Sequence, residues 1–490
     1  MNKKTFLIIL FCITALGFLL RFWNYSGRYG LAYDQAHDAI VAREAIREGK
    51  VPLVGPFSSA GPFQTAGTWY WLLMIPTALY PHSLLTPWIF LTFLSVLLII
   101  GMGFFGKYLE DDWFGLLLAV FTAISTAQIA QSVNLTNQTP IPFFSFLAIV
   151  FAVLYLKEKK LHLAFLMGFC AAFAASIHLQ GMSLGLIVFF ALIFSGKAGL
   201  KSFFVSCIGA IIPMTPLFLW DATNDFINVK NMFYYYRYDQ FNISLDVLGR
   251  RWLTYLSDFW PREWAHILGG FPYIAMGIAI IVLFFFGYYI LKRKLSSYWL
   301  LVFISFFCMV ILVRYTRVPI FASFITFMHP FVILITGWGV YKIVKHNRYA
   351  GYLFLLCVFI GTIWKTSIEV FTPRVNWTAR AAIETRNMLT KKYPNEKFAL
   401  YDYKYDETRR SVPYVLFLDE ANLLSDSGRK IGFIRAKAQE LLQTDIISTD
   451  GGLISDLTSS SSATLLSDGW AFINPSKIYS STEEWRTKPK

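Results

Sequence analysis

Two aspartates four residues apart are the side chains in this sequence best suited to acid–base chemistry. Asp34 and Asp38 lie in the phrase YDQAHD, with Gln35 and His37 between them. If residues 34–48 form a helix, both carboxylates share one face near its N-terminus. A carboxylate beside a substrate hydroxyl accepts its proton during attack, which is general base catalysis. The alternative is structural: Asp34 caps the helix and Asp38 favours the helix dipole.

The residues after this pair show the pattern of a helix. Apolar side chains recur at helical spacing, and Gly49 is placed to end the element. The glycine- and proline-rich run that follows, up to residue 63, is predicted as loop. The apolar positions are Ile40, Val41, Ala45 and Ile46.

A basic pair later in the chain is suited to binding phosphate. Arg314 and Arg317 flank Tyr315 in the phrase RYTR, between two apolar segments. Guanidinium groups bind phosphate oxygens through paired hydrogen bonds, and the Tyr315 hydroxyl adds a further donor. The alternative is that both arginines extend towards lipid headgroups. The sequence leaves these two interpretations open.

His178 and Gln180, in the phrase SIHLQGM, form a further polar pair at the end of an apolar segment. Polar side chains within reach of a membrane are costly unless they are paired or functional. A packed, hydrogen-bonded histidine and a substrate contact both fit this position. We carry both residues forward as candidates for substrate binding.

Composition shows which solvent surrounds these residues. Of 490 residues, 56% are hydrophobic and 15% are charged, with a mean hydropathy of +0.50. A soluble domain averages about 25% charged residues, so lipid must surround most of this chain. A span needs about 20 mainly apolar residues. We predict a mainly α, polytopic transmembrane bundle of about eleven spans, at 5–22, 86–106, 113–129, 141–156, 161–178, 182–195, 201–220, 270–291, 297–313, 318–341 and 350–367.

Charge in the short loops predicts the orientation of the spans. With the N-terminus in the cytoplasm, the inner loops carry 14 basic and four acidic residues, as the positive-inside rule requires. The net charge of +14 is therefore a topology signal rather than a nucleic-acid footprint. An odd number of spans places the first loop and the tail outside. All five cysteines lie in apolar segments, without disulfide or zinc spacing, so no metal site is predicted.

Two regions outside the spans complete the predicted architecture. Residues 64–80 are apolar but short and contain Pro76, so we place them as an interfacial helix in the first outer loop. We assign 1–371 to the membrane domain and 372–490 to a small extracytoplasmic α/β domain. In that domain KFALYDY and YVLFLDE are predicted as strands, 377–392 and 434–443 as helices, and the serines at 459–462 as a loop.

The phrase LAYDQAHDAIVAREAIREGKVPLVGP resembles the first outer loop of the integral membrane glycosyltransferases of GT-C type. The resemblance is to the bacterial branch, related to protein O-mannosyltransferases and to aminoarabinose transferases that modify lipid A. It extends over about residues 1–370 in the order of spans and loops. Asp34 matches the essential aspartate of the family. Asn137, in AQSVNLTNQTPIPFF, falls at the polar position of the second outer loop, and SIHLQGM and IPMTPLFLWDATNDF match further segments.

The resemblance implies an inverting hexosyl- or pentosyltransferase fed by a polyprenyl-phosphate sugar donor. Asp34 is then the catalytic base. The predicted substrate-binding residues are Gln35, His37, Asp38, Asn137, His178, Gln180, Arg314, Tyr315 and Arg317. The acceptor is a lipid, a glycan or a protein. The Trp-Trp-Asp signature of oligosaccharyltransferases is absent, which argues against en bloc transfer to asparagine.

Other functions stay open at this point. No Gly-rich phosphate loop is present, which agrees with a lipid-linked donor rather than a nucleotide sugar. No cofactor is predicted, with a divalent cation as the open alternative. A lipid or sugar transporter or flippase is the second hypothesis, although the acidic residues lie in loops rather than within spans. A non-catalytic scaffold is the third. Each fits a multi-pass protein of the plasma membrane.

Overall fold

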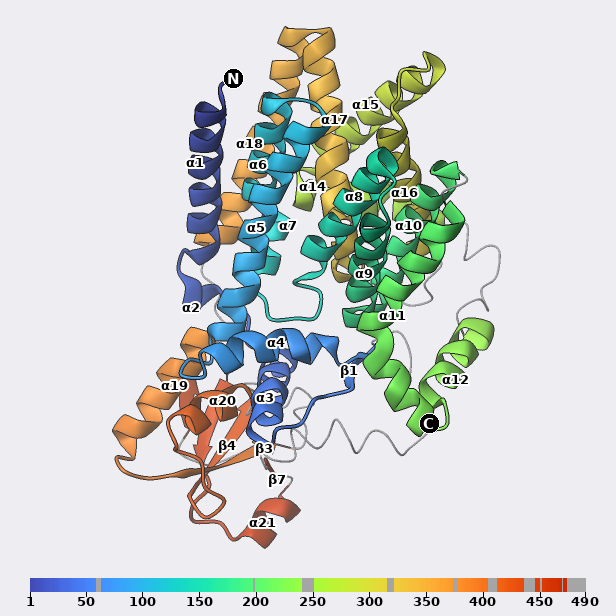
Figure 1. Ribbon diagram of the computed structural model, residues 1–490. Helices are drawn as coiled ribbons and strands as arrows, with labels where there is room; N and C mark the ends of the chain where they lie inside the picture. Colours follow the sequence, from blue (N-terminus) through green and yellow to red (C-terminus); the bar gives the residue numbers. More distant parts are fainter. Residues whose placement is uncertain are drawn as a thin grey trace.

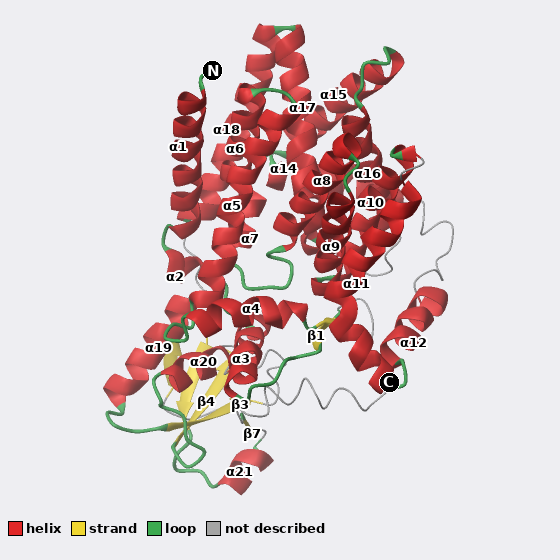
Figure 2. Cartoon of the chain, viewed as in Figure 1, coloured by secondary structure: helices red, strands yellow, loops and turns green. Residues whose placement is uncertain are grey.

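The computed structural model describes ten stretches of the chain. They are residues 1–58, 63–196, 199–239, 251–314, 321–372, 378–403, 412–435, 446–449, 452–468 and 470–473. Helices dominate, and a small sheet gathers at one end of the molecule (Figure 2).

The described part of every predicted span is mainly helical, and residues 318–320 of the predicted span 318–341 lie outside the described residues. Within the described residues, eight helices are long and apolar enough to cross a membrane, and the bent pair α6–α7 is a ninth candidate. The segments Leu161–Ile177 and Leu179–Phe194 are apolar but shorter. The elements concerned are α1 (Lys3–Phe22), α5 (Thr86–Leu109), α6 (Asp112–Ile124), α7 (Thr126–Ser132), α8 (Ile141–Glu158), α9 (Leu161–Ile177), η1 (Leu179–Leu184), α10 (Gly185–Phe194), α11 (Gly199–Thr223), α15 (Pro272–Leu291), α16 (Ser297–Arg314), η5 (Ala322–Met328), α17 (His329–His346) and α18 (Arg348–Phe371).

The break between α6 and α7 is stabilised by a neighbouring helix. The two helices meet at an angle of 54°. Thr366 of α18 donates a hydrogen bond to the Ile124 carbonyl (2.6 Å), and its hydroxyl also lies 2.8 Å from that of Thr126. A helix break inside lipid needs such partners, because no water is available for the freed backbone groups.

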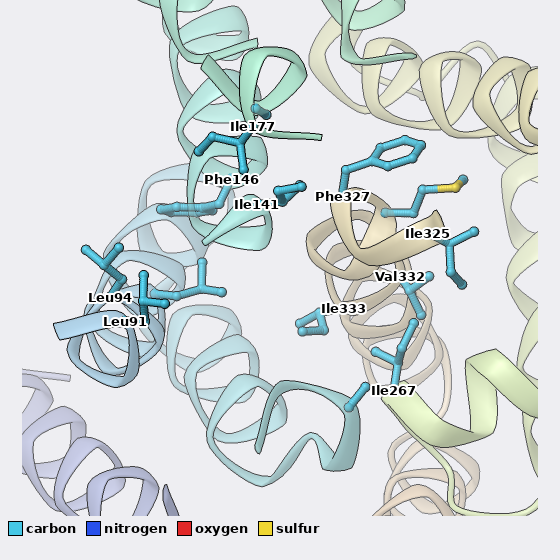
Figure 3. Close-up of a cluster of buried hydrophobic side chains, with 14 of the residues drawn as sticks. Leu91, Leu94, Ile141, Phe146, Ile177, Ile267, Ile325, Phe327, Val332 and Ile333 are labelled. Atoms are coloured by element: carbon cyan, nitrogen blue, oxygen red, sulfur yellow. The ribbon is translucent and has the colours of Figure 1, made fainter. Parts of the chain in front are cut away.

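Apolar side chains from several helices fill the centre of the bundle. Figure 3 shows residues of α5, α8, α9, η5 and α17 in one buried cluster, together with Ile267 of α14 (Trp260–Ile267). Glycines allow the closest approaches: a Cβ on Gly168 of α9 would lie 2.1 Å from the Ser206 carbonyl oxygen of α11. Small residues at such contacts are characteristic of helix pairs in membranes.

The two ends of the bundle differ in chemistry. Residues of the predicted inner loops form ion pairs at the end where the chain begins, among them Lys107–Asp112 (2.6 Å) and Lys342–Glu110 (3.1 Å). The C-terminal sheet lies at the opposite end (Figure 1). This arrangement agrees with the predicted alternation of loops, while the absolute orientation stays a prediction.

The first predicted outer loop folds into several short elements beside the C-terminal domain. They are α2 (Tyr25–Arg28), α3 (Tyr33–Arg47), β1 (Val54–Phe57), β2 (Gln64–Ala66) and α4 (Thr68–Leu79). Helix α4 runs across the ends of the spans (Figure 1), as expected of an interfacial helix. Gly49 follows α3 with φ +62°, the left-handed conformation that glycine tolerates.

The prediction that residues up to 63 form only loop was wrong, because β1 pairs with β2 as an antiparallel hairpin. The hairpin is tied to the corner after α11, where the Gln64 amide donates to Asn228 Oδ1 (2.7 Å). Asp221 in turn accepts from the amides of Asn228 and Val229 and so caps α12 (Ile227–Tyr234). Two further segments, η3 (Tyr235–Asp239) and η4 (Tyr255–Phe259), are described between α11 and α14.

The C-terminal domain is a mixed sheet with helices packed on it, as expected of an α/β unit. The five strands are in the order β5-β6-β4-β3-β7, in which the pair β3–β4 is parallel and the other pairs are antiparallel. The elements are α19 (Ala379–Lys392), β3 (Phe398–Tyr403), α20 (Val412–Glu420), β4 (Arg429–Arg435), β5 (Ile446–Thr449), β6 (Gly452–Asp456), α21 (Ser462–Ser467) and β7 (Trp470–Phe472).

Two predictions for this domain were wrong. YVLFLDE forms helix α20 rather than a strand. Pro413 suits the first turn of a helix, and buried Val412, Val415 and Leu416 follow helical spacing. In the predicted helix 434–443, residues 434 and 435 are the end of β4, and the rest lies outside the described residues. The predicted loop at 459–462 holds until residue 462, where α21 begins.

The glycine contact between α9 and α11 gives a stability prediction. Gly168→Ala should lower the melting temperature in detergent, since overpacking a close contact costs about 1–3 kcal/mol. Gly277→Ala in α15 is the matched control, because a Cβ there meets nothing within 4 Å and gains the same helix propensity. Equal melting temperatures for the two variants would contradict the packing argument.

Candidate functional site

Helix α3 carries both predicted carboxylates, those of Asp34 and Asp38. Neither of them caps the N-terminus of the helix. The N-cap is Ala32, whose amide donates to Gln35 Oε1 (3.1 Å). The alternative that Asp34 caps this helix is therefore wrong. Asp34 lies in the first turn, and no described residue donates a hydrogen bond to its carboxylate. Its position leaves that carboxylate available for a substrate.

Asp38 has the opposite character, because its carboxylate is buried and bonded. Oδ2 accepts from the indole N–H of Trp69 (2.8 Å), and Oδ1 accepts from the Tyr70 hydroxyl (3.3 Å). His37 Nδ1 lies 3.1 Å from Oδ1, and the His37 ring packs near that of Tyr33. Asp38 therefore fastens α3 to helix α4, and its predicted contact with substrate stays a prediction.

The electrostatic setting of Asp34 suits a base. Its side chain is exposed, yet enough protein surrounds the carboxyl group to weaken its hydration. This desolvation raises the pKa of Asp34 above its ordinary value, and the nearby charge of Asp38 raises it further, whereas His37 lowers it. A carboxylate with a raised pKa is a stronger proton acceptor once it is ionised.

The second predicted outer loop is joined to α3 by hydrogen bonds. Gln35 Nε2 donates to Asn134 Oδ1 (2.8 Å), and the Gly30 amide donates to the Val133 carbonyl (3.2 Å). Asn137 Nδ2 donates to the Ile177 carbonyl at the end of α9 (3.0 Å). The structure therefore brings Gln35 and Asn137 onto segments that contact one another.

The end of α9 closes this chain of contacts. The His178 ring is buried, with Nε2 3.2 Å from Gln138 Nε2, and it packs near Phe324. Thr68 at the start of α4 and Ser176 share a hydrogen bond of 2.7 Å. Gln180 is half-buried in η1. The candidate site thus lies where α3, α4, the loop after α7 and the end of α9 meet.

Of the two predicted phosphate-binding arginines, Arg314 lies within the described residues. The Arg314 side chain is buried at the end of α16, with its guanidinium 5.7 Å from the Tyr255 ring centroid. Tyr255 is held in turn by its hydrogen bond to the Val310 carbonyl (2.8 Å). Tyr315 and Arg317 lie outside the described residues. No contact in the described part of the chain links Arg314 to Asp34.

Sequence reasoning missed two features of this site. It did not identify Asn134, whose partner Gln35 is 99 residues away. It also placed residues 64–80 in an interfacial helix without identifying Trp69 and Tyr70 as donors to Asp38. Among the described residues, no group of three or more His, Cys, Asp or Glu side chains is arranged to hold a metal ion.

Comparison of the whole chain decides the fold. The sequence matches no protein-family model and no curated protein. The structure matches ArnT from Cupriavidus metallidurans in the apo state with a TM-score of 0.61 and 8% identity, covering 93% of this chain and 98% of ArnT. This chain has the GT-C fold. The match therefore confirms the resemblance inferred from the first outer loop at the level of fold.

Two further structures share the GT-C fold. ArnT from the same organism bound to undecaprenyl phosphate matches with a TM-score of 0.59 and 8% identity, over 94% of this chain and 99% of ArnT. The Archaeoglobus fulgidus oligosaccharyltransferase, in complex with Zn and sulfate, matches with a TM-score of 0.52 and 11% identity over 79% of this chain. The present chain spans only 56% of the length of that archaeal protein.

The contrast between the two aspartates gives a second prediction. Asp38→Ala should lower the melting temperature, because each buried donor left without an acceptor, at Trp69 and Tyr70, costs about 1–3 kcal/mol. Asp34→Ala, the same change on the same helix, should leave the melting temperature nearly unchanged. Thermal unfolding in detergent measures both, and a loss in the Asp34 variant as large as in the Asp38 variant would count against the assignment.

Proposed function

We propose that the chain is a glycosyltransferase that moves a sugar from a polyprenyl-phosphate-linked donor to an acceptor hydroxyl, with Asp34 as general base. One observation carries the proposal. In a GT-C fold, helix α3 of the first predicted outer loop presents one accessible carboxylate, that of Asp34, without a partner among the described residues. The neighbouring carboxylate, that of Asp38, is occupied by hydrogen bonds to α4.

A lipid-linked donor is supported from two directions. ArnT, which shares the fold over nearly its whole length, has been seen bound to undecaprenyl phosphate. The chain itself has no Gly-rich phosphate loop. Asp34 also lies beside the interfacial helix α4, where a lipid-borne sugar and a soluble or membrane-borne acceptor meet. We place this reaction at the outer face of the plasma membrane, following the charge pattern of the loops.

The proposed reaction is a single displacement. The acceptor oxygen forms a bond to the anomeric carbon while the bond from that carbon to the phosphate oxygen breaks. Asp34 takes the acceptor proton, and the electron pair leaves with the polyprenyl phosphate. Because the nucleophile enters opposite the leaving group, the anomeric configuration inverts, for a hexosyl or a pentosyl donor alike.

The other predicted site residues take more specific roles in this proposal. Gln35, Asn137 and His178 position the segments around Asp34 through their own hydrogen bonds, and Gln180 and His37 line the same region. Arg314 and Arg317, with Tyr315, are proposed to receive the leaving phosphate. Since Tyr255 already covers the Arg314 guanidinium, that contact requires the phosphate to approach the remaining edge of the group.

A lipid or sugar transporter is the second candidate. The buried pair of Gln128 Nε2 and His329 Nδ1, 2.8 Å apart within the bundle, is the kind of polar group that transport pathways contain. The two functions separate in proteoliposomes. Release of polyprenyl phosphate with formation of a glycosylated acceptor supports transfer, whereas movement of an intact labelled lipid-linked sugar without transfer supports transport.

Replacement of the proposed base gives the third prediction. Asp34→Asn should lower the transfer rate by about 10²–10⁴-fold, the usual contribution of a general base, and leave the protein folded. The rate is measured in detergent with a polyprenyl-phosphate sugar donor. Asp34→Glu should recover part of the rate, since it restores a carboxylate. Normal transfer by Asp34→Asn would refute the proposal.

The pH dependence of transfer gives the fourth prediction. The base must be ionised, so kcat/KM should fall as the pH drops through the raised pKa of Asp34, at a higher pH than an ordinary aspartate near 3.9 allows. His37→Gln removes a group that lowers this pKa, so the acid limb should move to higher pH. Asp38→Asn removes a group that raises the pKa of Asp34, so the acid limb of the pH–rate profile should move to lower pH.

A further inference from the structure

Helix α20 of the C-terminal domain packs directly against α3, the helix that carries Asp34 (Figure 1). Buried apolar residues of both helices belong to the same hydrophobic cluster, which includes Ile40 and Val41 of α3 and Val415 and Leu416 of α20. The membrane domain and the C-terminal domain are therefore continuous at this point. A change in the position of α20 is transmitted to α3 through packed side chains.

An ion pair reinforces this contact. Arg43 Nη2 lies 2.5 Å from Asp419 Oδ2, and Arg47 Nη1 lies 3.3 Å from the same oxygen. Arg43 and Asp419 are 12% and 27% exposed, whereas Arg47 is 53% exposed. A pair that is mostly removed from solvent is screened less than a surface pair, and loss of one partner leaves the other charge poorly solvated. The contact between Arg43 and Asp419 is therefore the stronger of the two.

The spacing of Asp34 and Arg43 along α3 shows which face of the helix Asp419 contacts. Nine residues separate Asp34 from Arg43, which is two and a half turns at 3.6 residues per turn. Arg43 therefore lies on the face of α3 opposite to Asp34. Asp38 fastens the helix to α4 one turn after Asp34, and Asp419 holds its far end from the other side. Helix α3 is therefore contacted on two different faces, by α4 at Asp38 and by Asp419 at Arg43.

We propose that Asp419 is a positioning residue for the transfer reaction: through Arg43 it fixes the rotation of α3, and so the place of the Asp34 carboxylate. This inference rests on the proposed function of Asp34. It assigns the C-terminal domain a part in the active site, since that domain supplies one of the two anchors of the helix bearing the base. A misplaced base lowers the rate of proton transfer without altering how donor or acceptor binds.

The experiment uses the full-length protein with charge changes in this pair. Asp419→Asn removes the contact, Asp419→Arg opposes Arg43 and Arg47, and the double variant R43E/D419R rebuilds one pair with reversed charges. Glu420→Gln is the matched control, because Glu420 is the next residue of α20 but pairs with Arg386 inside the C-terminal domain (3.7 Å). Transfer kinetics and hydrogen exchange of peptides covering residues 33–47 are measured for each.

The proposal expects kcat to fall by about tenfold in Asp419→Asn and further in Asp419→Arg, with KM values within about twofold of the parent. The double variant should regain part of the loss, and Glu420→Gln should stay near the parent. Rates of Asp419→Asn and Asp419→Arg within twofold of the parent, or an equal loss in Glu420→Gln, would overturn it.

Hydrogen exchange separates failure of this inference from failure of the proposed function. If the parent protein transfers no sugar, the assignment of Asp34 fails, and the coupling between the helices is judged by exchange alone. Faster exchange in residues 33–47 for Asp419→Asn, but not for Glu420→Gln, supports the control of α3 by Asp419. Unchanged exchange in both Asp419 variants overturns that control.

Discussion

The carboxylate of Asp38 is buried where Trp69 and Tyr70 donate hydrogen bonds to it, and the arrangement of the site depends on this contact. A buried charge is tolerated only when hydrogen bonds replace its hydration. The contact therefore joins α3 to α4, because the charge and both of its donors are satisfied where the two helices pack together. With α3 fixed in this way, Asp34 one turn earlier is held against the interface without using its own oxygens.

Packing within the membrane bundle places the segments that surround α3 and α4. At the bend between α6 and α7, Thr366 donates to the Ile124 carbonyl and Arg21 donates to the carbonyls of Thr122 and Ala123, so these polar groups have partners within the bundle. Gly168 and Gly209 allow α9 and α11 to approach at backbone distance. The end of α9 then carries Ser176 and His178 to α4 and to the second loop. Helix packing deep in the bundle thus decides where the polar residues at its end are placed.

Much of the fold could be predicted from local sequence, because hydropathy and helical spacing are local properties. The apolar spans, the helix predicted over 34–48 and the helix predicted within 64–80 follow from runs and periods in the chain, and α3 and α4 lie at these positions. The helix at 412–420 could not be predicted in this way, because a short apolar run fits a buried strand and a buried helix equally well. Its contact with α3, which lies some 370 residues earlier, decides between them.

The different roles of Asp34 and Asp38 were likewise outside the reach of local pattern. Both are aspartates on one face of one helix, and only their distant partners distinguish them. Trp69 and Tyr70 are 31 and 32 residues from Asp38, and Asn134 is 99 residues from Gln35. Hydrogen bonds of this kind leave no periodic trace in the sequence, since each depends on how two separate segments pack.

The carboxylates of Asp34 and Asp38 also interact electrostatically, in a direction that suits the proposed role of Asp34 as base. Partial desolvation is the largest cause of the raised pKa of Asp34. Asp38 is held close by its donors from α4, and its negative charge raises that pKa further. A base with a raised pKa binds a proton more strongly, and general base catalysis is most efficient when that pKa approaches the working pH. The residue that anchors the helix therefore also tunes the residue proposed to react, and both effects come from a single buried carboxylate.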